Sequence, residues 1–463
     1  MKKQFIRHLI MTVLLFGTMG LLFMWAANND RGYVEDMGNA YEAEPDLQDL
    51  YVHLGVGEYV PLPRLVERPF PVLRIYTENR QPVNSREIWV NAEFSLENLP
   101  EEHAFANASG RMRGRGNSTW YMHPKQSFRI RFDDRRTMAG TDHAARNWVI
   151  IGNHADKSLL RNHAAYYFAG LLDGMYYAPL SKFIDVYING DYRGVYMLSD
   201  HQNVEAGRVQ LTFDEDPAIS EFFLEMCSRR ADEGGEEGIH FVTINRRHYD
   251  IRFPRDELHT RDHAEYVRYF LSRFEYLARS GNERVFDYIH LQSFIDFYIV
   301  QEWFKNQDVG FASVFMQIRG QGEDRRLEMG PVWDFDIAAG NAYYAYARLG
   351  GYFPHGIWAR EMNRWFFYLM RMPTFYNAVH DRWREIRHTK IPATIDRINH
   401  MANTYRLGFE RNFERWNIMG RWVWPNPRRI YLIDTFMGQV DNLTNFLELR
   451  AAWLDEYFIL NRP

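Results

Sequence analysis

Two aspartates two positions apart, Asp334 and Asp336, are the residues of this chain with the clearest chemical potential. They follow the apolar run Gly330–Trp333 and precede Ile337–Asn341. Carboxylate oxygens suit Mg²⁺ and Mn²⁺, and Mg²⁺ usually needs only one or two of them beside the phosphates of a nucleotide. An Asp-x-Asp pair can also form a turn or cap a helix. The Asp-x-Asp pair therefore has two interpretations, a metal site at the end of an extended run or a structural turn or cap.

A further acidic residue, Asp308, ends the preceding segment Gln301–Asp308. A phosphoryl-transfer site needs at least two aspartates, one that orients the substrate hydroxyl and one that binds a metal ion. Asp308 could instead be a helix-terminal turn residue. Because helix C-termini disfavour anions, a carboxylate at this position is more easily explained by a nearby cation.

Several segments resemble, in order, the spore coat protein H (CotH) kinase-like family. They are Arg113–Trp120, Pro124–Phe132, Asp156–Asn162, Val186–Leu198 and Trp333–Asp336. The resemblance implies an atypical protein-kinase-like fold that uses ATP and Mg²⁺ or Mn²⁺ to phosphorylate protein hydroxyls.

The resemblance also implies roles for individual acidic residues. Asp308 corresponds to the catalytic aspartate that accepts or orients the proton of the substrate hydroxyl. Asp334 corresponds to the metal-binding aspartate, and Asp336 either adds a second ligand or caps the next segment. Ser313 stands where kinases often place an asparagine for a second metal ion. A neutral hydroxyl is a weaker ligand, so it puts that second site in question.

Lys125 is the candidate lysine for phosphate contact, expected on a strand with its side chain pointing away from the core. It follows the glycine-rich turn Arg113–Gly116, in which backbone N–H groups and Arg115 could also meet phosphate. The alternative is a tight hairpin beside a solvated lysine. The acidic partner of Lys125 remains open among Asp156, Asp200 and Glu225, and the Arg161–Asn162 pair has no assigned role.

Composition limits the classes of partner. The chain has 463 residues, 46% of them hydrophobic, with a net charge of −5 and a single cysteine, Cys227. Basic and acidic residues are mixed along the sequence, so no nucleic-acid partner is expected. One cysteine cannot form an internal disulfide.

The N-terminus predicts a membrane anchor. Lys2, Lys3 and Arg7 precede the apolar run Leu9–Ala27, which is close to the length that crosses a bilayer and lacks a clean cleavage site. We expect a signal anchor at residues 1–28 that leaves the globular part outside the cytoplasm; a cleaved signal peptide and a secreted protein are the alternative. Residues 29–65 are acidic and predict a tether, with a short helix near Leu47–Tyr51.

Residues 66–200 predict a mixed lobe of strands and a helix. Strands are expected at 69–76, 88–96 and 125–132, a helix at 158–172 capped by Asp156 or Ser158, and a hairpin of 183–188 and 192–198 around Asn189-Gly190.

Residues 201–463 predict a mainly helical, aromatic-rich lobe. Apolar spacing over Leu291–Trp303 predicts an amphipathic helix that delivers Asp308 at its end. A hairpin over 314–333, turning at Gln321–Arg326, would carry Asp308 and Asp334 to the same edge. The fold class is therefore α+β, an atypical bilobal protein-kinase-like fold.

Three functions are compatible with these observations. The first is a membrane-anchored extracytoplasmic kinase that transfers the γ-phosphate of ATP to Ser or Thr of envelope, spore-coat or secreted proteins, itself included. The second is a weakly active pseudokinase or scaffold of an envelope or coat layer, favoured by Ser313. The third is a glycosyltransferase, since Asp-x-Asp also holds Mn²⁺ for nucleotide sugars.

Overall fold

The computed structural model describes residues 69–228, 236–255, 258, 260–344 and 351–460. The predicted signal anchor (1–28) and the acidic tether with its short helix (29–65) lie outside these residues. Among the described helices, none combines the length and the apolar character needed to cross a bilayer.

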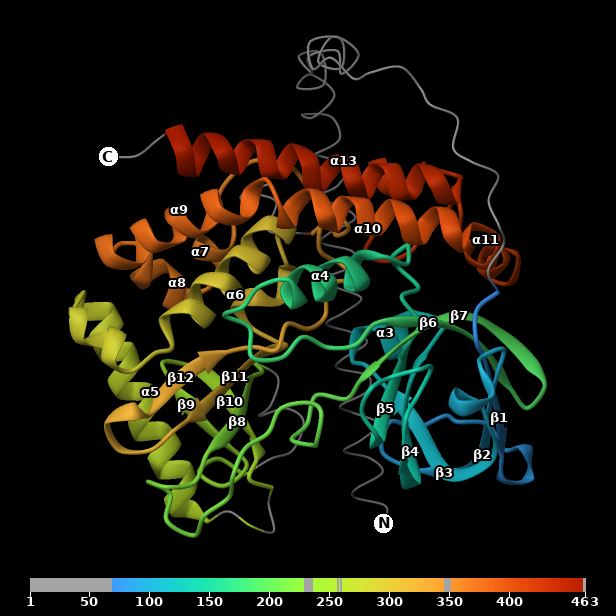
Figure 1. Ribbon diagram of the computed structural model, residues 1–463, viewed down its shortest axis with the longest axis horizontal. Coiled ribbons are helices and arrows are strands. Elements are labelled where there is room, and N and C mark those ends of the chain that lie inside the picture. The colour runs from blue at the N-terminus through green and yellow to red at the C-terminus, as the bar shows by residue number, and fades with distance from the viewer. Residues whose placement is uncertain (1–68, 229–235, 256–257, 259, 345–350, 461–463) are drawn as a thin grey trace, which may run out of the picture. The chain divides into compact units, whose positions relative to one another are not determined.

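The first part of the described chain closes into a β-barrel (Figure 1). Neighbouring strands are antiparallel except for the pair that closes the barrel, in which β1 runs parallel to β6. The strands follow the barrel order β1-β2-β3-β4-β5-β7-β6. Their bounds are β1 (Val72–Thr77), β2 (Val90–Glu97), β3 (Phe105–Arg115), β4 (Ser127–Arg136), β5 (Ala145–Ile151), β6 (Lys182–Ile188) and β7 (Asp191–Asp200).

Alternating side chains fill this barrel. On β4, Phe128, Ile130 and Phe132 are buried in its core, which confirms the predicted period of two. The predicted hairpin is also confirmed, because β6 and β7 flank Asn189-Gly190. Both turn residues have positive φ, 54° and 90°, as a type I′ turn requires.

A second, antiparallel sheet has the order β12-β11-β8-β10-β9. The predicted hairpin is confirmed by the pairing of β11 with β12. The description of residues 201–463 as mainly helical missed the other strands of this sheet. The bounds are β8 (Phe222–Met226), β9 (Phe241–Ile244), β10 (Arg247–Phe253), β11 (Val314–Arg319) and β12 (Arg326–Met329).

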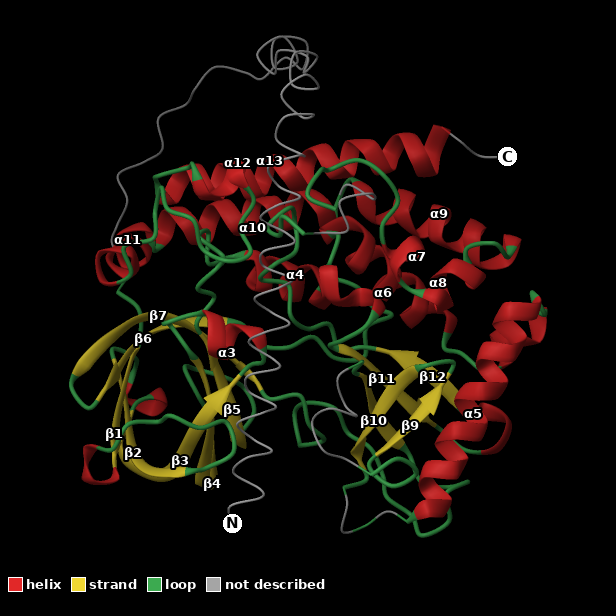
Figure 2. Cartoon of the chain, turned by 180° about the vertical axis from the view of Figure 1, so that it is seen from behind, coloured by secondary structure: helices red, strands yellow, loops and turns green. Residues whose placement is uncertain are grey.

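Most of the helices form a layer that lies over both the barrel and the second sheet, whereas α3 lies at the barrel and α5 beside the sheet (Figure 2). Their bounds are α3 (Ser118–Met122), α4 (Arg161–Gly170), α5 (Arg261–Ser280), α6 (Leu291–Phe304), α7 (Ala359–Met362), α8 (Arg364–Leu369), α9 (Pro373–Arg387), α10 (Lys390–Thr404), α11 (Arg406–Arg415), α12 (Arg428–Tyr431) and α13 (Phe436–Asp455). Phe70 stacks on Tyr405 at 4.7 Å between ring centres, which joins the start of the barrel to the helical layer. The mixed α+β class is therefore confirmed, and the kinase-like arrangement of two lobes stays a prediction.

Helix α6 forms where expected but is not amphipathic, because its polar side chains are buried as well. Asp296 accepts a hydrogen bond from Arg382 at 2.8 Å, and Glu302 pairs with Arg450 inside the protein. Glu302 also accepts the backbone N–H groups of Trp358 and Ala359 at 2.6 and 2.7 Å. These charged partners let a helix with interior carboxylates occupy the core.

Candidate active site

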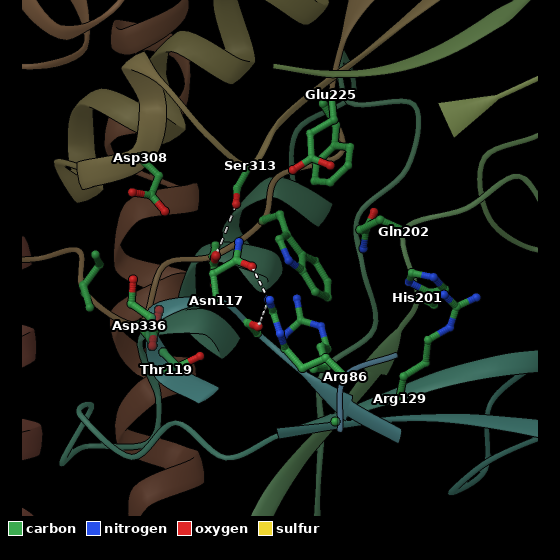
Figure 3. Close-up of a pocket in the computed structure, with 18 of the residues that line it drawn as sticks. Arg86, Asn117, Thr119, Arg129, His201, Gln202, Glu225, Asp308, Ser313 and Asp336 are labelled. Carbon is green, nitrogen blue, oxygen red and sulfur yellow. Dashed lines mark hydrogen bonds between the residues drawn. The ribbon is translucent and has the colours of Figure 1, made fainter. Parts of the chain in front are cut away.

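A cleft of about 420 Å³ lies between the barrel, the second sheet and the loops that follow α6 and β12. Five of the predicted site residues line it: Arg115, Asp308, Ser313, Asp334 and Asp336. Figure 3 shows Asp308 and Asp336 on one side of the pocket, and Arg129 and His201 on the other. The cleft thus has an acidic side and a cationic side.

Asp308 reaches the cleft because α6 ends abruptly. Lys305 ends the helix in the left-handed conformation, with φ 47°, and a short 3-10 turn, Gln307–Gly310, follows. The side chain of Asn306 accepts the backbone N–H of Asp308 at 3.1 Å, which fixes the start of this turn. The predicted delivery of Asp308 beyond the end of this helix is confirmed.

Asp334 and Ser313 contact each other across the base of the β11–β12 hairpin. Ser313 Oγ donates a hydrogen bond to Asp334 Oδ2 at 3.2 Å. Both residues have positive φ, 54° for Ser313 and 66° for Asp334, which is uncommon for residues with a side chain. Strained backbone of this kind tends to persist where a site needs it.

Asp336 is buried close to two other carboxylates. Its burial, followed by the nearby charges of Asp334 and Asp156, raises its pKa to about 8. The carboxyl group of Asp336 therefore holds its proton more tightly than usual. A cation bound beside it would displace that proton, because the cation stabilises the carboxylate form.

The segment that carries both aspartates is held by the start of α4. Asn162 Oδ1 accepts the backbone N–H of Phe335 at 2.6 Å, and Arg161 Nε donates to the carbonyl of Ala338 at 3.1 Å. Arg161 in turn forms a fully buried ion pair with Asp156 at 2.6 Å. These contacts give the Arg161–Asn162 pair, which had no role from the sequence, a positioning role.

The start of α4 differs in one respect from its prediction. The helix begins at Arg161 rather than Ser158, and Asp156 Oδ2 accepts the backbone N–H of Arg161 at 2.8 Å. Asp156 therefore caps the first turn as expected, from farther upstream.

The predicted glycine-rich turn is instead the end of strand β3, because Arg113, Gly114 and Arg115 pair with residues of β4. This strand end lines the cleft and is shaped by close packing. A Cβ at Gly114 would lie 2.2 Å from the ring of Trp120, and Gly116 has φ 105°. Arg86 donates to the carbonyl of Gly116 at 2.7 Å and to Asn117 Oδ1 at 2.6 Å (Figure 3). Arg115 lies over the ring of Trp333, 4.9 Å from its centre. Arg115 thus lies beside the segment that carries Asp334, and its predicted contact with phosphate stays a prediction.

The expectation for the side chain of Lys125 is wrong. This residue precedes β4, is only 2% exposed, and is absent from the lining of the cleft. Its ammonium group donates to the carbonyl of Val195 and to Asn412 Oδ1, the latter at 2.8 Å. The partners that the sequence left open for it pair elsewhere: Asp156 with Arg161, Asp200 with Arg208, and Glu225 with Arg252. Lys125 therefore ties the barrel to α11.

The cationic side of the cleft was not foreseen. It contains Arg86, Arg113, Arg129 and Arg252 besides Arg115, together with His201 and Gln202. Burial and the surrounding guanidinium groups lower the pKa of His201 well below its usual range, which keeps the imidazole neutral. Alternation along β3 and β4 places their arginines on one face, but only the assembled fold shows that this face meets the aspartates.

These residues fit a divalent cation with a bound polyphosphate. The described residues contain no group of three or more His, Cys, Asp or Glu side chains arranged to hold a metal ion. A pair of carboxylates is sufficient for Mg²⁺, which completes its coordination with phosphate and water oxygens. Asp334, Asp336 and Ser313 would supply the oxygens for such an ion, and the arginines on the other side of the cleft suit phosphate.

The cleft of this mixed α+β protein is lined by carboxylates and arginines. The family model described as CotH kinase protein matches residues 112–454, and the chain belongs to this family. The resemblance noted in the sequence is thereby confirmed, and it indicates kinase-type function in general terms. Comparison with curated proteins finds no match.

Proposed function

We propose that this protein transfers the γ-phosphate of ATP to Ser or Thr hydroxyls of proteins, and that it does so outside the cytoplasm. The observation that supports this proposal most directly is the convergence of Asp308, Asp334 and Asp336 with Arg115 in one cleft of a CotH-family chain. These residues come from segments far apart in the sequence, and each has a place in phosphoryl transfer.

In this proposal Asp308 acts as the general base. The substrate oxygen forms a bond to the γ-phosphorus while the bond to the β–γ bridging oxygen breaks, and ADP leaves with that electron pair. The proton of the hydroxyl passes to the Asp308 carboxylate. Mg²⁺ or Mn²⁺, when bound by Asp334 and Asp336, supplies positive charge beside the phosphates. Arg115 and the other arginines that line the cleft orient the phosphate oxygens through charge-assisted hydrogen bonds.

The test is transfer of label from γ-labelled ATP by the full chain in Mg²⁺ or Mn²⁺, with dephosphorylated casein as an added acceptor. We expect label on casein or on the chain itself, lost in both Asp308→Asn and Asp334→Asn. The matched control is Asp324→Asn, an exposed turn residue outside the cleft. Label that survives Asp308→Asn unchanged would contradict the assigned base.

A nucleotide-binding scaffold is the second candidate. Lys125 lies outside the cleft, and Ser313 offers a neutral oxygen where a second metal ion would need a stronger ligand. This candidate predicts metal-dependent thermal stabilisation by ATP, lost in Asp334→Asn, without any transfer of label. Stabilisation by a nucleotide sugar instead of ATP would favour the glycosyltransferase.

The location outside the cytoplasm is proposed from the N-terminal sequence. Basic residues followed by the apolar run Leu9–Ala27 are typical of a signal anchor. Alkaline phosphatase fused after Pro463, which is active only after export, tests this directly. An inactive fusion that is stably made would contradict the proposed location.

A further inference from the structure

Arginines face one another across two strands of the barrel beside the cleft. In the pairing of β3 with β4, Arg111 lies opposite Arg131 and Arg113 lies opposite Arg129. Like charges directly opposite on a sheet are destabilising. We call Arg111, Arg113, Arg129 and Arg131 the arginine patch.

The arginine patch carries no compensating ion pair within the described part of the chain. Glu87 is the acidic residue whose charge acts on Arg113, and it is exposed to solvent. Burial and then the charges of Arg113, Arg255, Arg131 and Arg252 lower the pKa of Arg129 to about 9. Arg255 lies just beyond β10 and adds to the positive field around Arg129, whereas Arg252 of β10 is itself paired with Glu225 and Asp250.

Trp89 gathers these side chains into one surface. The guanidinium groups of Arg111, Arg113 and Arg129 lie 5.2, 4.8 and 5.5 Å from the centre of its ring. Cation–π contacts of this kind hold the cations in place at little entropic cost to a later ligand. The patch is therefore preorganised for an anion.

The arginine patch is continuous with the cleft but extends beyond it. Arg113 and Arg129 line the cleft, whereas Arg111 and Arg131 do not. ATP bound in the cleft accounts for the first two residues and leaves the other two without a ligand. Gln202, 7% exposed, lines the same side of the cleft, and neither its amide nitrogen nor its amide oxygen has a hydrogen-bond partner. A buried amide without partners points to a polar ligand.

We propose that the arginine patch binds an anionic segment, acidic or phosphorylated, of the protein whose hydroxyl is phosphorylated. This inference rests on the proposed kinase function and specifies its class of substrate. Alternate residues of a strand are about 7 Å apart. The spacing of Arg111 and Arg113 therefore matches acidic groups at alternate positions of an extended peptide, which leads from the patch to Asp308. The amide of Gln202 is placed to pair with the backbone of such a segment.

A nucleic acid fits this surface less well. Single strands bind where aromatic rings are free to stack on bases, and the ring of Trp89 is engaged by three guanidinium groups. This feature favours a short acidic peptide over a nucleic acid.

The test measures peptide binding to the full chain by fluorescence anisotropy, which does not depend on catalysis. The probes are a Ser-containing peptide with Glu at alternate positions, the same peptide with phosphoserine in place of Glu, one with Lys in place of Glu, and a short single-stranded DNA. We expect both anionic peptides to bind and the Lys peptide not to bind. Affinity should fall as salt rises.

The variant Arg111→Gln/Arg131→Gln removes charges outside the cleft. We expect roughly fivefold to tenfold weaker binding of the anionic peptides. Stabilisation by ATP should be unchanged, and thermal stability should be unchanged or higher because an opposed like-charge pair is removed. Arg279→Gln/Arg384→Gln, which removes two exposed helix arginines, is the control and should leave peptide binding unchanged.

Several outcomes would overturn the inference. These are equal binding of Glu and Lys peptides, full affinity in the double variant, binding of DNA alone, or a loss of stability in the double variant that accounts for weaker binding. Phosphoryl transfer with no preference among the peptides would reject the inference and keep the proposed function. Selective peptide binding without any phosphoryl transfer would reject the proposed function, and the arginine patch would remain a binding surface for anionic peptides.

Discussion

Asn162 Oδ1 accepts a hydrogen bond from the backbone N–H of Phe335 at 2.6 Å, and Phe335 stands between the two cleft aspartates. The amide nitrogen of Asn162 donates to Asn153 Oδ1 at 2.9 Å, so the side chain is fixed at both ends. The orientation of Asp334 therefore depends on a residue of α4.

Replacing Asn162 should disturb the metal site through this contact. In Asn162→Ala, the buried N–H of Phe335 loses its acceptor, which should lower the free energy of unfolding by about 1–3 kcal/mol. Metal-dependent stabilisation by ATP should fall further than this global loss explains. Asn91→Ala is the control, since the side chain of Asn91 is exposed and donates to Glu78 at 3.2 Å, away from the cleft. If ATP stabilises Asn162→Ala as much as it stabilises the original protein, Asn162 does not position Asp334.

Lys125 should matter for stability and not for nucleotide affinity. In Lys125→Met the buried donor to Val195 and Asn412 is lost, and the free energy of unfolding should drop by about 1–3 kcal/mol. The affinity for ATP should stay the same. Arg115→Met, made at the cleft, should show the reverse pattern. Isothermal titration and urea unfolding on both variants would separate these effects, and weaker ATP binding in Lys125→Met alone would restore its predicted contact with phosphate.

Gly114, near the end of β3, should tolerate no methyl group. Gly114→Ala brings a Cβ to 2.2 Å from the ring of Trp120, so the strand or the ring must shift. Overpacking of this kind costs about 1–3 kcal/mol. Gly170→Ala, whose Cβ meets Ala178 at an ordinary 3.5 Å, should be neutral or stabilising. Thermal unfolding of the two variants measures the difference, and equal midpoints would show that β3 accommodates the methyl group freely.

The pair of His143 and Asp200 should make stability depend on pH. The hydrogen bond from His143 Nε2 to Asp200, 2.9 Å long, is the main cause that raises the pKa of His143. A raised pKa means that this contribution is complete below the ordinary histidine pKa and is lost as the pH rises through the folded-state value. His143→Asn should therefore destabilise the protein more at about pH 5.5 than at about pH 8.5. His400→Asn, at an exposed helix position, is the control for urea unfolding. A constant difference across this range would contradict the assignment.

The sequence predicted those parts of the fold that depend on local chemistry. The Asn189-Gly190 turn, the alternation on β4 and the β11–β12 hairpin are all present, because each is specified within a few residues. Three of the predicted acidic positions also reach one cleft.

Features that depend on distant contacts were missed. Lys125 was expected to point away from the core, toward phosphate, because its neighbours alternate, yet its ammonium group is buried and bonds to Asn412 of α11 and Val195 of β7. The segment of α6 was expected to form an amphipathic helix, yet its carboxylates Asp296 and Glu302 are buried and paired with Arg382 and Arg450 of later helices. No local pattern in the sequence carries information about these partners.

The parallel contact of β1 with β6 has a practical consequence for the limits of the domain. The match to the CotH family begins at residue 112, inside β3, whereas the barrel is closed by strands that come before that point. A fragment cut at the matched boundaries would lose β1, β2 and part of β3, and would expose the edges of β6 and β4 together with the barrel interior. Such open edges pair with other chains. The smallest unit worth expressing therefore begins upstream of Val72, and a shorter one is expected to aggregate for reasons unrelated to its chemistry.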